Sequence, residues 1–551
     1  MKNRVLSILL AVVLVLSVGL ISCGGEEMPE IQEYQLAISS TEGGEVTSPG
    51  EGIFTYDEGA DVDLEAVADE GYLFDGWVGD VGTIADVENA TTTINMNGDY
   101  IITANFVEIP KYPTALVIST ARDTDEDLAY FEMAVAGPVI REFVEQVNLA
   151  GGVHLSAYDT ATETCYVPLE IDRREVNVAT WDIAEVTAGI CADIVNGDVH
   201  FLFGGPTIDC ILTQAPIANE AGVVLLTLEG GSARIRNDPD KLASWPYVFN
   251  TLSFSDWYQL PVLSDMLEAE LGRTPKAYVA YICCDEHGEE YLAVAKDNFD
   301  VVGDVEVPFS ITQSEATTLI QNAIAALGDP HNPNYDIFCG FYFPWHVHSL
   351  TRASIENNFN PPAIVFGPGA NFGDYLYYLG GPLNPSLVDG ILSFTIAAYD
   401  TNPEIQAIYD LIAERMDDDE GDPLSGVPSW PGILSLDYWG TPLYWAGLEM
   451  WLEAVERVGY VDQEKLRDAL AAFEGDPADT ILGECWFRMY GANGEGGGHL
   501  DYLCHTGEIG QWQSGVYETV GYEGITYELP NYVVTADFMF PMTDKWNWLQ
   551  D

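Results

Sequence analysis

Two short segments bring together side chains that could bind a metal ion. Residues 283–287 read Cys-Cys-Asp-Glu-His, and His346 and His348 would share one face of an extended strand. Neither segment has the spacing of a closed zinc site, and aromatic side chains crowd the two histidines. The acidic run 417–422 lacks the register of a calcium-binding loop, so we expect a solvated loop there. We therefore predict no metal site and no cofactor.

Motifs for covalent or nucleotide chemistry are also missing from the sequence. There is no nucleophile elbow, no Walker loop and no dinucleotide fingerprint followed by the expected acidic residue. The pair Gly204-Gly205 alone is a weak signal. The chain is therefore predicted not to be an enzyme, and reversible binding is the alternative.

The stretch from His200 to Ser232 predicts a βαβ unit. Two short apolar runs, 201–203 and 223–226, each end near a glycine pair, and a helix-length segment separates them. Continuous apolar runs favour strands that are buried on both faces of a parallel sheet. Ligands of such sheets bind beyond the carboxyl ends of the strands. Both glycine turns are therefore candidate site loops.

Further apolar runs alternate with helix-period segments along the rest of the chain. This alternation predicts an α/β fold with doubly wound parallel sheets. The runs contain the following residues: Val224, Val279, Ile337, Ile364 and Ile391.

The amino terminus has the composition of an export signal. Lys2 and Arg4 precede an apolar run over 5–20, which is shorter than a comfortable membrane span. The run ends in Leu-Ile-Ser-Cys-Gly, which resembles the lipobox of bacterial lipoproteins. The resemblance implies that residues 1–22 are removed and that lipid on Cys23 anchors the protein to the membrane, facing outside the cytoplasm. The alternative is an uncleaved membrane anchor.

Composition limits the remaining possibilities. The chain has 551 residues, of which 47% are hydrophobic, so two or three domains are expected. Its 88 acidic and 20 basic residues give a net charge of -68, which disfavours nucleic acid as a partner. The excess indicates either a salty habitat or simple solubility.

Eight cysteines besides Cys23 remain in this exported setting. Cys485 and Cys504 flank a glycine-rich, hairpin-like stretch and are predicted to form a disulfide bond. A bond between the adjacent Cys283 and Cys284 would be strained. The connectivity of the others cannot be read from the sequence.

Residues 31–109 have the pattern of a small all-β module. Short alternating segments are separated by glycine-rich turns such as Gly43-Gly44. The stretch from Tyr34 onward, with Gly71-Tyr72 and Gly76-Trp77 at its centre, resembles the divergent internalin B-type repeat of bacterial surface proteins. We interpret the module as a spacer whose aromatic residues pack in its core. A linker near Glu108 to Pro113 follows.

Beyond the linker, several segments in order resemble the type I periplasmic binding proteins of the branched-chain amino acid and amide group. The match covers about residues 112–551. Its segments include GPVIREFVEQVNLAGGV, FLFGGPTIDCILTQAPIANEAGVVLLTL, PYVFNTLSFSDWYQLPVLSDML and KAYVAYICCDEHGEEY.

This resemblance implies a two-lobed solute-binding domain over residues 113–551. One lobe would contain about 113–249 and 396–480, and the other about 250–395 and 481–551. The implied function is capture of a small amino-acid-like, amide or cationic solute and its delivery to an ABC transporter permease, with the protein acting as a monomer. The alternative is a ligand-sensing or surface interaction lipoprotein without a transport role.

The resemblance also implies which residues contact the solute. In amino-acid binders of this family, small hydroxyl residues hold the ligand carboxylate and an acid in the second lobe binds the ammonium group. Here the matching loops carry Asp209 and Glu229, and the second-lobe segment 366–371 has no acid. Two carboxylates would repel a ligand carboxylate by roughly 1 kcal/mol or more each, so a neutral amide or a cationic solute is predicted. Alternatively, both acids cap helices.

Aromatic side chains are expected to stack on such a solute and to attract its positive charge. The complete set of predicted ligand-binding residues is Phe131, Thr207, Asp209, Thr227, Glu229, Asp285, Tyr342, Trp345, Asn371 and Tyr438.

Overall fold

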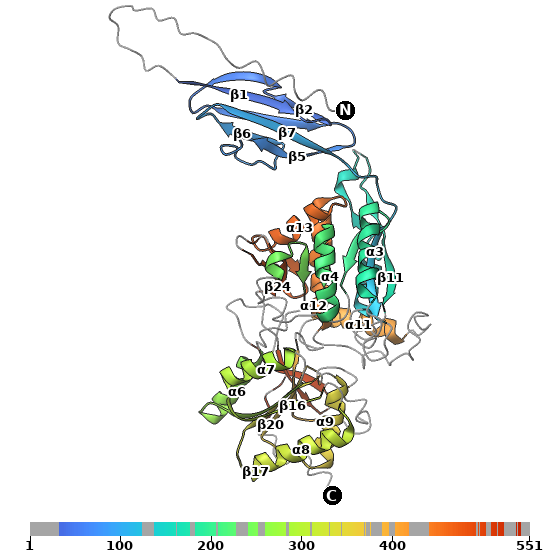
Figure 1. Cartoon of the computed structure of the whole chain (residues 1–551), viewed down its shortest axis with the longest axis vertical. Helices are drawn as coiled ribbons and strands as arrows, with labels where there is room; N and C mark the ends of the chain where they lie inside the picture. The colour runs from blue at the N-terminus through green and yellow to red at the C-terminus, as the bar shows by residue number, and fades with distance from the viewer. Residues whose placement is uncertain are drawn as a thin grey trace, which may run out of the picture. The chain divides into compact units, whose positions relative to one another are not determined.

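The chain forms two compact units, Met1–Ile109 and Pro110–Asp551, in a computed structural model (Figure 1). Their boundary falls inside the predicted linker. None of the described helices is long and apolar enough to cross a membrane. The structure describes residues 32–123, 137–160, 162–176, 182–204, 208–227, 241–251, 259–282, 286–308, 311–329, 331–342, 344–368, 370, 375, 388–395, 403–417, 440–491, 494, 496–502, 508–514, 516–522, 536 and 538–540.

The first unit consists of two β-sheets around one core. One sheet has the strand order β3-β1-β7-β5 and the other has the order β2-β4-β6. The β1 and β7 strands are parallel, and the other neighbouring strands are antiparallel. The strands are β1 (Glu33–Ser40), β2 (Gly44–Ser48), β3 (Gly52–Asp57), β4 (Asp61–Ala68), β5 (Tyr72–Gly79), β6 (Thr91–Asn95) and β7 (Tyr100–Glu108).

Alternation of side chains explains why this unit folds as a two-sheet module. In β4, Val62, Leu64 and Ala66 point into the core, whereas the acidic residues between them are exposed. Trp77 is buried, and its indole N–H donates to the carbonyl oxygen of Asn89 at 3.1 Å. The aromatic residues at its centre therefore serve packing, as the sequence indicated.

The second unit contains two large sheets, and the first of them has eight strands. Their order is β11-β8-β12-β13-β14-β24-β23-β22. Each strand from β11 through β24 in this order is parallel to its neighbour. The strands are β8 (Leu116–Asp123), β11 (Leu169–Val176), β12 (Phe201–Phe203), β13 (Leu225–Thr227), β14 (Val248–Asn250), β22 (Ala478–Thr480), β23 (Gly483–Met489) and β24 (Gly498–Tyr502).

The central strands of this sheet are fully buried, which explains their continuous apolar runs. Helices pack around the sheet, and Trp451 of one of them meets the rings of Phe201 and Phe203 edge-on. These helices are α2 (Gly137–Leu149), α3 (Ile183–Asn196), α4 (Ile208–Ala221), α11 (Pro403–Asp417), α12 (Gly440–Val458) and α13 (Gln463–Ala472).

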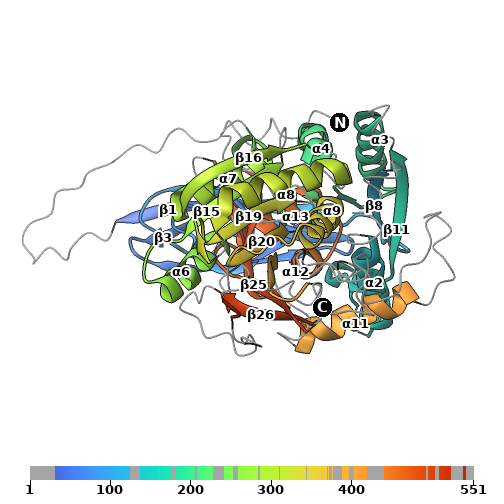
Figure 2. The ribbon, with the colours of Figure 1, turned by 90° about the horizontal axis from the view of Figure 1, so that it is seen from below.

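The second large sheet has seven strands in the order β16-β15-β19-β20-β21-β25-β26 (Figure 2). The first five are parallel to one another, and β25 and β26 are antiparallel additions at one edge. The strands are β15 (Lys276–Ile282), β16 (Asp300–Val307), β19 (Ile337–Tyr342), β20 (Ala363–Pro368), β21 (Ile391–Thr395), β25 (Glu508–Gln513) and β26 (Val516–Tyr522).

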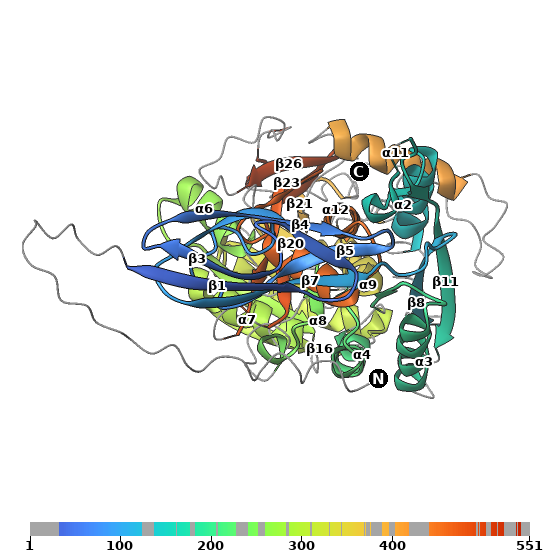
Figure 3. The same ribbon diagram turned by 90° about the horizontal axis from the view of Figure 1, so that it is seen from above.

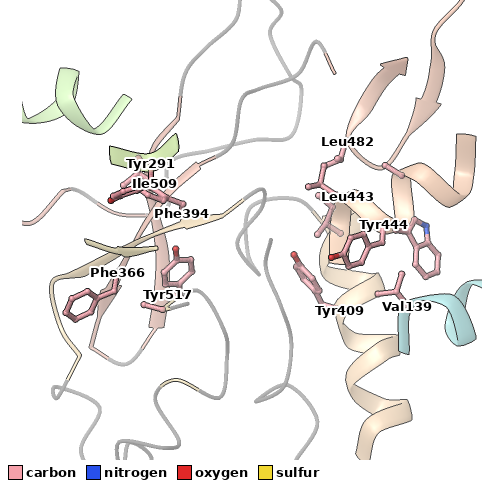
Figure 4. Packing of buried hydrophobic residues seen from close by; sticks show 14 of the residues in the cluster. Val139, Tyr291, Phe366, Phe394, Tyr409, Leu443, Tyr444, Leu482, Ile509 and Tyr517 are labelled. Atoms are coloured by element: carbon pink, nitrogen blue, oxygen red, sulfur yellow. The ribbon is translucent and has the colours of Figure 1, made fainter. Parts of the chain in front are cut away.

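Helices of this sheet begin at recognisable signals. At α8, Thr312 and Glu315 form a capping box, in which each side chain binds the backbone N–H of the other residue. The helices are α6 (Gln259–Leu271), α7 (Glu286–Asn298), α8 (Gln313–Leu327) and α9 (Pro344–Glu356). Figure 4 shows aromatic core residues around both sheets, including Phe394 and Tyr291 at one and Tyr409 and Tyr444 at the other.

This arrangement confirms the predicted α/β architecture with an amino-terminal all-β module. We expected residues 481–551 to belong to the second lobe. Instead, the strands β23 and β24 pair within the first sheet. Gly498 permits this pairing, since a Cβ atom there would lie 2.7 Å from Phe487 and 2.9 Å from Phe249. Among the described strands of the tail, β25 and β26 alone join the second sheet.

An insertion precedes β11 in the first sheet. The strands β9 (Val153–His154) and β10 (Tyr166–Val167) pair antiparallel, and the 3₁₀ helix η2 (Ser156–Tyr158) lies between them. These elements form a hairpin between α2 and β11. The remaining short elements are η3 (Leu242–Ser244), β17 (Gly328–Asp329) and β18 (Asn332–Pro333).

Candidate functional site

Strand order identifies where each sheet can bind a ligand. In the first sheet, the chain passes from β8 to β11 on one side and then to β12 on the other side of β8. In the second sheet, it passes from β15 to β16 and then to β19 on the opposite side. Such reversals leave a crevice at the carboxyl ends of the strands, because the two connections leave toward opposite faces. The candidate site therefore lies beyond the ends of β8, β12, β15 and β19.

Buried polar side chains lie at the carboxyl ends of β13 and β14. The hydroxyl oxygen of Thr227 accepts a hydrogen bond from the Asn250 side-chain amide at 2.7 Å. The hydroxyl of Thr251 donates to the carbonyl oxygen of Thr227, also at 2.7 Å. All three side chains are almost completely buried. Hydrogen bonding offsets the desolvation of these groups and holds the two strand ends together.

Two glycines allow close packing around this polar cluster. A Cβ atom at Gly204, directly after β12, would lie 3.2 Å from the Cα of Thr227. A Cβ atom at Gly447 of α12 would lie 2.4 Å from the methyl group of Thr251. The helix α12 therefore packs directly on the end of β14, and it follows the segment that contains Tyr438.

The second sheet has a comparable arrangement. A Cβ atom at Gly288 would lie 2.1 Å from the carbonyl oxygen of Ile282, so the first turn of α7 contacts the end of β15. A Cβ atom at Gly367 would lie 2.4 Å from the ring of Phe394. The hydroxyl of Ser393 donates to the carbonyl oxygen of Phe366 at 2.8 Å. These glycines thus allow close backbone packing next to the candidate loops, Gly288 after the segment with Asp285 and Gly367 before the segment with Asn371.

Four predicted site residues belong to described elements. Thr227 ends β13, Tyr342 ends β19, and Asp209 and Trp345 are the second residues of α4 and α9. The structure does not describe the side chains of Tyr342, Asp209 and Trp345. A carboxylate in the first turn of a helix is favourable, so helix capping stays an alternative role for Asp209.

The other predicted positions lie outside the described residues altogether. They are Phe131, Thr207, Glu229, Asp285, Asn371, Tyr438, Cys23 and Cys504. The partner of Cys485 in the disulfide prediction is among them, so that bond stays a prediction. Cys485 itself is buried in β23 opposite Tyr502 of β24, two residues before Cys504.

The suggestion that His346 and His348 share a strand face is wrong. Pro344 opens α9, and residues two positions apart point in different directions on a helix. The Nε2 atom of His346 lies 3.1 Å from the carbonyl oxygen of Pro308, whereas His348 stacks on Tyr375. Burial, together with the charge of Arg352, lowers the pKa of His348 to about 4. The described residues contain no group of three potential metal ligands.

Sequence reasoning missed the acid Glu449 on α12. One of its carboxylate oxygens accepts from the indole N–H of Trp445 at 3.1 Å, and the other accepts from the Ile481 backbone N–H at 2.9 Å. Burial raises the pKa of this carboxyl to about 7. Glu449 therefore attaches α12 to the turn between β22 and β23. Asn250 and Thr251 were also missed, although an Asn-Thr pair directly after the apolar Val-Phe was a weak signal.

Comparison with known proteins identifies the first unit and the fold of the second. Residues 34–110 match the family described as the divergent InlB B-repeat domain. No curated protein sequence is detectably similar to the chain.

Solved structures of solute-binding proteins share the fold of the second unit. The branched-chain amino acid transporter substrate-binding protein LivJ from Streptococcus pneumoniae, bound to isoleucine, has 13% identity and a TM-score of 0.53, over 74% of this chain and 99% of its own. A solute-binding protein from Rhodopseudomonas palustris BisB5, bound to 3,4-dihydroxybenzoic acid, has the same identity and TM-score over 76% and 99%. One from R. palustris with benzoate has 15% identity and a TM-score of 0.51 over 77% and 99%. The second unit therefore has the type I periplasmic binding protein fold.

Proposed function

We propose that this protein is a solute-binding lipoprotein that works outside the cytoplasm and delivers a small solute to an ABC transporter permease. The observation that carries this proposal is the pair of parallel sheets, each with a reversal of strand order and with its candidate loops at the carboxyl ends. Solved proteins with this fold include substrate-binding proteins of transporters. Capture of a solute needs no covalent chemistry, which agrees with the lack of catalytic motifs in the sequence.

The proposed site consists of the loops that follow the parallel strands of both sheets. In the first sheet, Thr207 follows β12, Asp209 lies in the first turn of α4, Thr227 ends β13 and Glu229 follows it. In the second sheet, Asp285 follows β15, Trp345 lies in the first turn of α9 after β19, and Asn371 follows β20. Phe131, Tyr342 and Tyr438 would add aromatic surface. Since Thr227 already binds Asn250, we assign its hydroxyl to positioning of the loop after β13.

The acidic residues of these loops determine the class of solute that we propose. Carboxylates at Asp209 and Glu229 would repel the carboxylate of an α-amino acid and attract a cation. Aromatic faces would hold an ammonium group by cation–π attraction. We therefore propose a neutral amide or a cationic solute, such as a quaternary amine or a polyamine.

Thermal-shift screening of the mature protein against amino acids, amides, polyamines and quaternary amines tests this proposal. We expect stabilisation by an amide or amine, weakened at least fivefold in affinity by Asp209→Asn and Glu229→Gln. The exposed Asp198→Asn serves as the control for loss of one negative charge near the same sheet. Tight binding of leucine or valine that both site variants leave unchanged would disprove the solute class.

Anchoring is tested separately. Mass analysis of the protein from membranes should find the chain beginning at a lipid-modified Cys23, and Cys23→Ala should abolish this modification. An intact Met1 or an unmodified Cys23 would contradict the lipoprotein proposal without affecting the proposed solute.

A further inference from the structure

The outer face of the sheet β3-β1-β7-β5 carries apolar side chains in register across its strands. On β1, Leu36 and Ile38 point into the core, so Ala37 points outward. Ile53 of β3 and Ile101 of β7 both lie directly opposite Ala37. Residues opposite one another share a face, so these three side chains form a row across adjacent strands. Figure 3 shows the strands β3, β1 and β7 that carry them.

The two isoleucines of this row are open to solvent. Ile53 is 63% exposed and Ile101 is 67% exposed. Val78 of β5, 48% exposed, extends the row because it lies opposite Thr103, two residues beyond Ile101. A single exposed apolar residue is ordinary, but a contiguous apolar group marks an interaction surface. We call these residues, Ala37, Ile53, Val78 and Ile101, the apolar row.

Charge limits what can cover the apolar row. Residues 34–110 contain sixteen acidic residues and no Lys, Arg or His. At one end of the same face, Glu33 lies directly opposite Asp57, and both are exposed. Like charges opposite each other are unfavourable, and residues 34–110 supply no cation to compensate them. The face therefore combines an apolar centre with carboxylates that lack a local counter-ion.

We infer that this face docks a protein partner that presents Lys or Arg side chains around apolar residues. A second copy of the chain is disfavoured because its net charge of -68 would repel this unit. Anionic lipid headgroups are disfavoured for the same reason. A cationic strand or hairpin matches both features, because its apolar side chains cover the row and its basic side chains reach the Glu33–Asp57 pair.

A synthetic peptide with alternating valine and lysine is a suitable probe of the full mature protein. We expect saturable one-to-one binding by calorimetry, weakened at least fivefold by the double substitution Ile53→Ser and Ile101→Ser. The matched control is Val67→Ser, since Val67 is an exposed apolar residue of β4 in the other sheet. We expect this control to bind within twofold of the wild type. Circular dichroism verifies that each variant is folded.

The acidic pair is tested in the same way. Glu33→Gln with Asp57→Asn should weaken peptide binding more than Asp61→Asn with Asp63→Asn, which removes the same charge from the other sheet. Equal losses would overturn the inference, because binding would then depend on total charge alone. Absence of peptide binding would also overturn it. So would concentration-dependent dimers or adsorption to phosphatidylglycerol vesicles that Ile53→Ser and Ile101→Ser abolish.

Discussion

Thr227 shows how a residue of the candidate site can hold the ends of two strands together. Its hydroxyl and carbonyl oxygens bind Asn250 and Thr251, so one residue connects the ends of two parallel strands. We expect Thr227→Val to lower the free energy of unfolding by about 1–3 kcal/mol, because a buried amide loses its acceptor. Urea unfolding measures this change. Thr227→Ser keeps the hydroxyl and should lose clearly less stability, whereas equal losses in both variants would show that the methyl group matters instead.

Glu449 should make the stability of this protein depend on pH in an unusual direction. Its pKa is raised to about 7 in the folded state, so between about pH 4.5 and 7 the folded chain binds a proton that the unfolded chain releases. The contribution of Glu449 to stability is therefore largest below about pH 4.5, falls as the pH rises, and is constant above about pH 7. We expect this fall to amount to about 3 kcal/mol.

The Glu449→Gln variant isolates this effect from the many other carboxylates. Denaturant unfolding at pH 5 and pH 8 should show the variant losing less stability than the wild type between the two values. A difference between variant and wild type that is independent of pH would contradict a raised pKa.

At the scale of single residues, the sequence predicted where a residue lies in the fold better than which groups it hydrogen-bonds. Thr227 could be expected at a strand end because an apolar run stops there. The partner of Glu449 could not be expected, because the Ile481 backbone N–H lies far along the chain and only the fold brings it near.

At the scale of elements, tight contacts between helices and strand ends are the most specific feature. Gly288→Ala would place a Cβ atom 2.1 Å from the carbonyl oxygen of Ile282, and backbone atoms must move to relieve this clash. We expect a loss of roughly 2–4 kcal/mol in the free energy of unfolding. The control is Gly189→Ala inside α3, where the nearest atom would be 3.7 Å away. That change should stabilise the protein by about 0.5–1 kcal/mol, and similar losses at both sites would contradict the argument.

The inserted hairpin contacts the linker in a way that can be measured. The hydroxyl of Tyr158 donates to the carbonyl oxygen of Pro110 at 2.9 Å, and that of Tyr112 donates to the carbonyl oxygen of Tyr166 at 3.2 Å. The rings of Tyr112 and Tyr158 meet edge-on with centroids 5.0 Å apart. The hairpin therefore orders the backbone on both sides of Lys111.

Limited trypsin digestion should measure how firmly the backbone around Lys111 is held. Trypsin cleaves after basic residues, and Lys111 is the first basic residue after Arg4. We expect Tyr158→Phe to speed cleavage after Lys111 by about two- to tenfold, as one hydrogen bond contributes about 0.5–1.5 kcal/mol. Mass analysis of the released amino-terminal fragment gives the rate. Tyr100→Phe removes a hydroxyl from β7 and should leave it unchanged. An unaltered rate in Tyr158→Phe would show that the contact does not restrain the linker.

Sequence patterns predicted most elements because apolar periodicity records burial directly. They failed where a short aromatic segment was ambiguous, as at Trp345 and His346, where Pro344 begins a helix instead of continuing the strand. They also failed for β23 and β24, since the pairing of Gly498 with Phe249 depends on shape and leaves no periodic signal.

At the scale of the whole molecule, the acidic surface is the dominant physical feature. Its effect should be strongest in the first unit, where residues 34–110 contain no basic side chain. On β4, the exposed Asp61, Asp63 and Glu65 follow one another on the same face. Repulsion within such a row decreases when salt shortens the Debye length from roughly 30 Å at 0.01 M to 3 Å at 1 M.

We therefore expect hydrogen exchange in peptides from β4 to slow as sodium chloride rises from 0.01 M to 1 M. Asp63→Lys should slow exchange at low salt and reduce this dependence, because it places a cation between two carboxylates. Glu88→Lys changes the net charge equally from an exposed position outside β4, so it separates the local row from the total charge. Equal effects of the two variants would assign the repulsion to the whole surface, and faster exchange at high salt would contradict it altogether.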